Sequence, residues 1–218
     1  AGTGIYYQYN RLYNPNVFTG LFLNMWAYVQ TKNFWNIEIF ANGSPVNGYD
    51  YFEARTAGRY FITPKDNTVG FWVGSDSRKK LRISGFLDYQ TFDVEGRREI
   101  SWEISPRYRV NDKFNFEFEF GNFKDFDDVG YVTTTENNDI IFGRRDRTTV
   151  VNSLEANYNF NSQMALTLRG RHYWSKVIYN GFDLLNSDGT LGKTAYFNTE
   201  DNDFSFNAFT VDMIYRWR

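Results

Sequence analysis

Charged side chains that could bind or conduct a polar solute recur at alternate positions in several segments of this sequence. Positive and negative charges are equally represented among them, so they could form either a hydrated solute site or a set of cross-strand ion pairs. The ten residues are Arg82, Asp88, Glu103, Arg107, Arg109, Glu117, Glu119, Glu155, Arg169 and Arg171. We favour the ion pairs, because charges carried on strands need partners when water is scarce.

Side chains suited to catalysis are few. Cysteine is absent, which excludes disulfides, thiolate metal sites and cysteine nucleophiles. The single histidine, His172, shares the parity of Leu166 and Leu168, so we expect it among apolar side chains in a structural or interfacial role. We therefore predict no catalytic residues and no enzymatic activity in this chain.

Three further segments resemble ligand-binding motifs only in part. The acidic segments Lys124–Asp128 and Glu200–Asp203 could offer oxygen ligands to Ca²⁺, but neither has the EF-hand spacing, so we expect solvated loops. Ser187–Thr194 reads SDGTLGKT and ends like a phosphate-binding loop, yet serine stands where that motif needs its first glycine. Because Asp188-Gly189 is a strong turn signal, we expect a plain turn there, and we predict no metal site and no cofactor.

The elements that carry these residues show strict alternation of apolar and polar side chains. Phe114–Phe120 reads FNFEFEF, and in a β-strand this places the rings on one face and the polar groups on the other. The same pattern recurs about ten times, each time near the ~9 to 11 residues that a membrane-spanning strand needs. We expect lipid to contact one apolar set: Leu21, Leu23, Ile100, Trp102, Ile104, Phe114, Phe116, Phe118, Phe120, Leu166, Leu168, Val211 and Met213. The ten charged residues would then face a lumen.

The connections between these segments alternate in length. The short ones are rich in turn-forming residues: Thr31–Asn33, Asp76–Lys79, Asn111–Lys113 and Asn161–Gln163. The long ones are polar: Asn10–Asn16, Gly43–Asp66, Thr91–Arg97, Asn122–Phe142 and Asn180–Asp203. Short turns at one rim and long loops at the other are typical of an outer-membrane barrel. This regularity requires Tyr131–Thr135 to belong to a long loop, or to a hairpin within it, and not to a spanning strand.

Composition limits the remaining classes. A net charge of -2 and an isoelectric point near 5.5 disfavour a nucleic-acid partner, which would need a clustered basic face. Apolar runs of about 18 or more residues are absent, so the sequence encodes no transmembrane helix. A mean hydropathy of -0.56 combined with 20% aromatic residues fits strands that have one apolar and one wet face.

Several blocks of the sequence resemble a known family. They are Asn10–Asn24, Gly48–Phe61, Gly70–Lys80, Ser105–Asp112 and Ile140–Thr149, and they are similar to the C-terminal outer-membrane barrel region of the Bacteroidota domain-of-unknown-function 5916 family. The resemblance implies an all-β, antiparallel up-and-down transmembrane barrel in the bacterial outer membrane. Long members of the family add an N-terminal carbohydrate-binding-like module, which is absent here. We expect residues 1–218 to form one barrel segment, incomplete at both ends.

Two classes of function follow from this pattern. The first is an integral outer-membrane protein with a transport-related or scaffolding and surface-anchoring role, tied to glycan or nutrient handling in a larger complex. Its partners would be outer-membrane lipid and other outer-membrane or periplasmic proteins. The alternative is a soluble β-sandwich or lectin-like module, whose strands would be about half as long. A barrel-embedded hydrolase is a remote third alternative.

Overall fold

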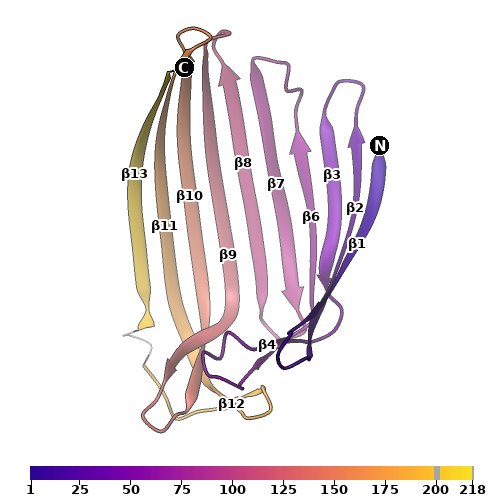
Figure 1. The fold of residues 1–218 in the computed structure, drawn as a ribbon, viewed down its shortest axis with the longest axis vertical. Helices are drawn as coiled ribbons and strands as arrows, with labels where there is room; N and C mark the ends of the chain where they lie inside the picture. Colours follow the sequence, from indigo (N-terminus) through magenta and orange to yellow (C-terminus); the bar gives the residue numbers. More distant parts are fainter. Residues whose placement is uncertain (199–201, 218) are drawn as a thin grey trace.

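The computed structural model describes residues 1–198 and 202–217, and most of them belong to one antiparallel sheet (Figure 1). The strands are β1 (Gly2–Arg11), β2 (Phe18–Gln30), β3 (Asn36–Ser44), β4 (Gly48–Asp50), β5 (Phe61–Thr63), β6 (Asp66–Gly74), β7 (Leu81–Phe92), β8 (Arg98–Arg109), β9 (Phe114–Thr134), β10 (Ile140–Asn159), β11 (Met164–Leu185), β12 (Leu191–Lys193) and β13 (Phe204–Trp217). The prediction of an all-β antiparallel fold is confirmed.

Long strands follow one another as an up-and-down meander. Their order in the sheet is β1-β2-β3-β6-β7-β8-β9-β10-β11, with β12 and β13 both pairing with β11. The short strands β4 and β5 form a separate hairpin. Leaving out β4, β5 and β12, the meander contains ten long strands, in agreement with the number of alternating segments in the sequence.

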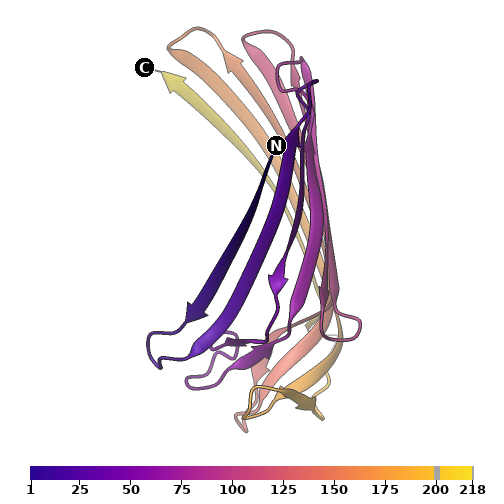
Figure 2. The same cartoon turned by 90° about the vertical axis from the view of Figure 1, so that its right-hand side faces the viewer.

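The sheet is curved and open. Figure 2 shows it from the side as a trough whose first and last long strands stand apart. In the described part of the chain, β1 pairs only with β2 and β13 only with β11. These strands therefore form an arc and not a closed barrel.

Short turns connect the strands at one end of the sheet, which we call the tight-turn rim. They lie where the sequence predicted them and are held by side chains: the Asn111 Oδ1 atom accepts a hydrogen bond from the Lys113 N–H at 2.9 Å, and the Asn161 Oδ1 atom accepts one from the Gln163 N–H at 2.8 Å. Asparagine favours such turns because its side chain bonds backbone donors two residues ahead. The opposite end is the long-loop rim.

Three of the predicted long loops are wrong in extent. The segment Asn122–Phe142 is not a loop, because β9 and β10 continue as a paired hairpin with its turn at residues 135–139. Similarly, β11 extends to Leu185 and leaves a shorter connection than Asn180–Asp203. The connection predicted at Thr91–Arg97 is reduced to residues 93–97. In these extensions, backbone pairing continues although the apolar-polar alternation does not.

Among the described residues, a compact core of buried apolar side chains lies at the long-loop rim. Its buried members are Ala54, Phe61, Ile140, Phe142 and Leu185, and the rings of Phe61 and Phe142 lie 4.9 Å apart. The strand extensions of β9 to β11 supply one side of this core. The connection between β3 and β6 supplies the other.

That connection, residues 45–65, runs along the long-loop rim beneath several strands, and we call it the bridging segment (Figure 1). Tyr49 packs against Phe18 of β2 with ring centroids 6.3 Å apart. The Glu53 carboxylate accepts a hydrogen bond from the Tyr131 N–H of β9 at 2.8 Å. In the sheet order, four strands lie between β2 and β9. The bridging segment therefore joins parts of the arc that are far apart in the sheet (Figures 1 and 2).

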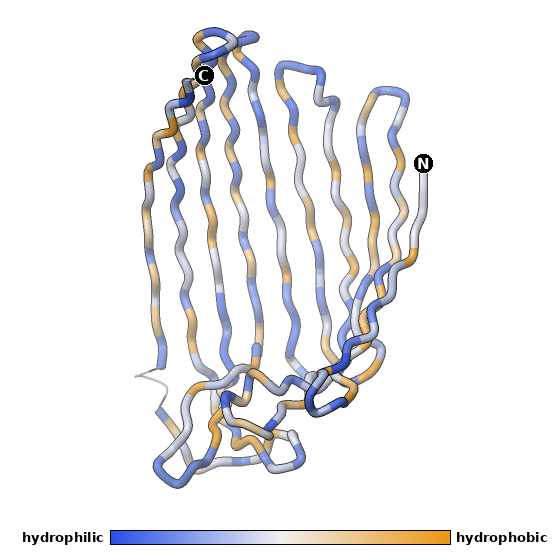
Figure 3. The backbone as a smooth tube through the Cα atoms, in the orientation of Figure 1, coloured by the Kyte–Doolittle hydropathy of each residue, from blue (hydrophilic) through white to orange (hydrophobic). Residues whose placement is uncertain are grey.

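Over the rest of the sheet, apolar side chains are largely uncovered. Figure 3 shows hydrophobic and hydrophilic residues interspersed along the long strands, as alternation requires. Within the described residues, the protein has no helix with the length and apolar character needed to span a membrane.

Candidate functional site: the two faces of the sheet

The strand register places all thirteen predicted lipid-contacting residues on one side of the sheet, which we call the apolar face. One row of directly opposed residues across it is Leu81, Tyr108, Phe116, Ala156, Leu168 and Met213. Side chains on this face are uncovered in the chain by itself: Val211 is 59% exposed and Met213 is 72% exposed. Monomeric soluble proteins rarely expose a contiguous apolar surface of this extent.

The apolar face has a defined height. It begins at Phe114, beside the tight-turn rim, and ends where Lys124 and Lys176 enter the same face, in one row with Thr148. Ten residues separate Phe114 from Lys124, which corresponds to about 33 Å along a strand. With the ~40° tilt of barrel strands, this is about 25 Å along a barrel axis, equal to the apolar band of outer-membrane barrels.

The ten charged residues share the opposite side, the polar face. One row of it consists entirely of charged residues on six strands: Arg82, Arg107, Glu117, Glu155, Arg169 and Asp212. Asp212 was missing from the predicted set, although its alternation with Val211 and Met213 was a usable signal. Charges of the same sign are neighbours in this row: arginines lie on β7 and β8, glutamates on β9 and β10, and an arginine again on β11.

Ion pairs form on one part of the polar face. The Arg169 Nε atom donates to the Glu155 carboxylate at 2.6 Å, and the Arg171 Nη2 atom donates to the Asp212 carboxylate at 2.6 Å. Asn157 also donates to Glu155, at 2.7 Å. These contacts connect β10, β11 and β13 through their side chains.

Elsewhere on the polar face, charged groups lie close without forming ion pairs. Arg107 is directly opposite Glu117, but the Nη2 atoms of Arg107 and Arg109 donate instead to the Ser77 carbonyl, at 3.1 and 3.4 Å. Among the described residues, no ion pair joins Glu117 or Glu119 to a cation. Arg107 and Arg109 therefore form no ion pair with these two glutamates.

An open cavity of about 430 Å³ lies on this face beside the unpaired glutamates. Its lining is mostly ionic or hydroxylic and consists of Glu117, Glu119, Val151, Ser153, Glu155, Arg169 and Arg171. A carboxylate that lacks a cationic partner needs water or a polar solute to keep its charge. The cavity is thus suited to water and polar solutes.

Side chains on the two faces of the curved sheet differ in solvent exposure. Among residues of the long strands on the polar face, Thr68, Ser84, Thr167 and Ser175 are buried, whereas large side chains on the apolar face are exposed. Bending a sheet crowds side chains on its inner side and spreads those on its outer side. This difference indicates that the polar face lies on the inside of the curve.

Aromatic rings occupy the polar face on the N-terminal strands, next to glycines. A Cβ atom added to Gly4 would lie 2.1 Å from the Trp26 ring, and one added to Gly70 would lie 2.4 Å from the Phe40 ring. The two glycines therefore leave room for rings from neighbouring strands. Each ring covers the glycine directly opposite it on the neighbouring strand, a pairing that depends on the strand register.

The acidic segment Lys124–Asp128 is not a solvated loop. It belongs to β9, where Asp125 pairs with Arg147 and the Asp128 Oδ2 atom pairs with the Arg145 Nη2 atom at 3.0 Å. The described residues contain no cluster of acidic or histidine side chains that could hold a metal ion. In Glu200–Asp203, residues 200 and 201 lie outside the described residues, and the Asp203 carboxylate accepts a hydrogen bond from the Tyr179 N–H at 2.7 Å.

Ser187–Thr194 forms a turn that leads into β12. The Asp188 carboxylate accepts hydrogen bonds from the Thr190 hydroxyl at 2.6 Å and from the Thr190 N–H at 3.0 Å, and these bonds lower the pKa of Asp188. Gly189 has a φ of 83°. The turn is closed by its own side chains and resembles no phosphate-binding loop.

His172 lies on the apolar face, in one row with Phe120, Asn152 and Phe209. Its Nδ1 atom is 3.2 Å from the Asn152 side-chain amide, and its Nε2 atom is 3.1 Å from the Asn207 Oδ1 atom. Both ring nitrogens are thus occupied by amides. A base that activates a nucleophile on the polar face must lie on that same face. His172 lies on the apolar face and so cannot take that role.

Comparison with protein families identifies a relationship for the whole sheet. A family model described as a domain of unknown function (DUF5916) matches residues 2–218. The chain belongs to this family. The match extends over both faces of the DUF5916 sheet and both of its rims, so the charged rows and the apolar face lie within the family domain. No curated protein and no solved structure gives a significant match to the DUF5916 chain.

Proposed function

We propose that this chain is a wall segment of a transmembrane β-barrel in a bacterial outer membrane. The observation that carries the proposal is the exposed apolar face, which crosses all the long strands and has the height of a membrane's apolar band. In a soluble β-sandwich such a face would be packed against a second sheet. Residues 1–198 and 202–217 provide no second sheet of that size, since the other sheet consists of β4 and β5.

The polar face is then the hydrated interior, and we propose a transport-related role for it. Glutamates without cationic partners and an open polar cavity favour contact with water and polar solutes over a fully packed interior. Aromatic rings such as Trp26 and Phe40 add apolar surfaces against which a sugar could pack. The handling of glycans or nutrients within a larger outer-membrane complex fits these features.

A scaffolding and surface-anchoring role is the second candidate, and the long-loop rim favours it. That rim has its own buried core and continues the strands beyond the apolar face. Such a platform could hold other outer-membrane or periplasmic proteins. The two roles differ in whether solute crosses the membrane, so conductance separates them.

Membrane association is tested on the purified protein. We expect it to require detergent and to float with lipid vesicles in a density gradient. In the vesicles, the thiol of Phe118→Cys on the apolar face should be protected from a water-soluble cysteine-labelling reagent. A cysteine placed at Glu119 serves as the matched control, because it lies on the polar face and should react with small reagents. A monodisperse, detergent-free monomer that melts cooperatively would refute the proposal.

A further inference from the structure

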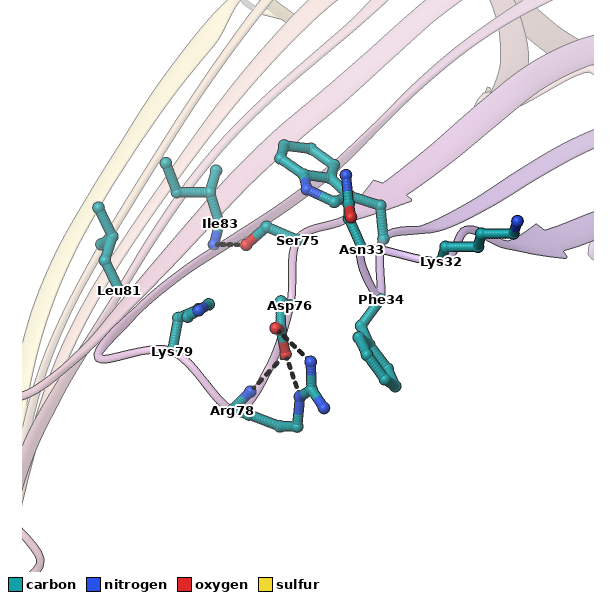
Figure 4. Close-up of a pocket in the computed structure, with 10 residues that line it drawn as sticks. Lys32, Asn33, Phe34, Ser75, Asp76, Arg78, Lys79, Leu81 and Ile83 are labelled. Carbon is teal, nitrogen blue, oxygen red and sulfur yellow. Dashed lines mark hydrogen bonds and ion pairs between the residues drawn. The ribbon is translucent and has the colours of Figure 1, made fainter.

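A cavity of about 550 Å³ lies at the tight-turn rim, between two neighbouring turns. One turn, residues 31–35, joins β2 to β3, and the other, residues 75–80, joins β6 to β7. The two turns lie side by side because β3 pairs with β6, with Asn36 opposite Gly74. Figure 4 shows the side chains that line the space between them.

One wall of the cavity continues the apolar face. It consists of three side chains at positions that alternate onto that face: Trp35, Leu81 and Ile83. Their exposed fractions are 44%, 50% and 41%. Tryptophan is enriched where a membrane protein meets the headgroup region, because its ring is apolar and its N–H is polar. The wall is therefore placed at the boundary between acyl chains and headgroups.

The other wall is cationic. Lys79 comes from the turn at 75–80 and lines the cavity together with Ser75, Leu81 and Ile83 (Figure 4). Lys32 lies on the facing turn and extends outward. Neither lysine forms an ion pair with any of the described residues. Both stems are long and flexible, so an anion bound at the cavity mouth would draw the two ammonium groups towards it.

The acidic side chain of the cavity is already neutralised. Asp76 accepts hydrogen bonds from the Arg78 Nε atom at 2.9 Å and from the Arg78 Nη2 atom at 2.8 Å. The Arg78 guanidinium also lies over the Phe34 ring, 3.3 Å from its centroid, which holds it in place. The positive charges of Lys32 and Lys79 are thus left without a counter-charge in the cavity.

We propose that this cavity binds the phosphate headgroup of an anionic phospholipid, with Lys79 and Lys32 on the phosphate and the acyl chains along Leu81 and Ile83. The inference rests on the proposed function, because only a membrane supplies this ligand at this position. The short turns of outer-membrane barrels lie on the periplasmic side. Basic pockets at the membrane surface that sit beside an apolar wall select anionic headgroups.

The test measures lipid retention by native mass spectrometry on the protein purified in detergent. Phosphatidylglycerol and phosphatidylcholine with identical acyl chains are added at equal concentration. We expect the wild type to retain phosphatidylglycerol in preference to phosphatidylcholine. Lys79→Gln should weaken the retention of phosphatidylglycerol about fivefold and leave the retention of phosphatidylcholine unchanged. Lys79→Arg should preserve the preference, and Lys32→Gln should reduce it.

The control is Lys113→Gln, a lysine in another turn of the same rim, whose ammonium donates to the Phe160 carbonyl at 3.2 Å. It should leave retention unchanged. Equal retention of both lipids, or equal losses in Lys79→Gln and Lys113→Gln, would overturn the inference, as would displacement of the lipid by millimolar inorganic phosphate. A protein that stays in detergent micelles but shows no preference overturns this inference alone. One that needs no detergent overturns the proposed function as well.

Discussion

Arginine substitution along β9 gives the sharpest test of how the apolar face is solvated. Phe114 lies beside the tight-turn rim, and Phe118 lies four residues further along the strand on the same face. Four residues correspond to about 13 Å along the strand, or about 10 Å of depth at a tilt near 40°. In an apolar band about 25 Å high, Phe118 is therefore close to the middle and Phe114 close to the edge.

The expected costs differ accordingly. Phe118→Arg should lower the free energy of unfolding by about 2–4 kcal/mol beyond the cost of Phe118→Ala, because an arginine near the middle of the band must leave water. Phe114→Arg should add only about 0–1 kcal/mol beyond Phe114→Ala, because its guanidinium can reach the headgroups.

The assay is reversible urea unfolding in phospholipid vesicles, followed by tryptophan fluorescence. Asn115→Arg is the matched control, since Asn115 lies on the polar face directly opposite Asn157 and should tolerate a charge. Equal costs at Phe114 and Phe118 would refute the depth argument. A soluble core would give that flat profile, because burial there does not depend on distance from a membrane surface.

Three further expectations concern packing and charge outside the apolar face. Gly70→Ala should destabilise the protein by about 1–3 kcal/mol in urea unfolding, because the added methyl would clash with the Phe40 ring, the Asp88 Cβ atom and the Leu87 carbonyl oxygen. Gly20→Ala should be nearly neutral, because its methyl would meet only the Asn10 side chain, at 3.9 Å. Phe61→Ala should cost about 3–5 kcal/mol at the long-loop rim and raise amide hydrogen exchange in the bridging segment, since Phe61 is buried against Phe142; unchanged exchange would contradict the packing role. Hydrogen bonds from the Arg78 side chain and backbone lower the pKa of Asp76 from 3.8 to about 2. The ionised Asp76 therefore contributes its full stabilisation of the folded protein above pH 3.8, and this contribution is lost as the pH falls through about 2. Side-chain NMR titration measures that midpoint, and an ordinary value would exclude the interaction.

Alternation in the sequence predicted the long strands and the face on which each side chain lies, because side-chain direction in a strand has a period of two. Phe114 and Glu117 each needed only their position in the strand to be assigned a face. The tight turns were equally local, since Asn111 and Asn161 bond backbone groups within two or three residues.

The extensions of β9 to β11 could not be predicted in this way. Asp125, Asp128 and Arg145 carry charge where the apolar alternation has ended, so the segment looks like a loop. What holds it as a strand is the pairing of its aspartates with Arg145 and Arg147 of β10, which depends on the register between the two strands. Local sequence patterns do not contain that register.

Contacts on the polar face were predictable only in outline. Parity placed Arg107 and Arg109 on the correct face, but their hydrogen bonds go to Ser77, a carbonyl in a turn about thirty residues earlier. The pairing of Arg171 with Asp212 likewise joins side chains that lie 41 residues apart in the chain. Face follows from local spacing, whereas partners follow from topology.

The bridging segment has a consequence for the order of folding. Its Arg59 side chain donates to the carbonyls of Leu185 and Asn186, which lie 126 and 127 residues later in the chain. Contacts over such separations form slowly, because a long stretch of chain must first be ordered. The segment therefore cannot reach its final position until β11 has joined the sheet, and its protection from proteolysis should report when the last long strands have been added.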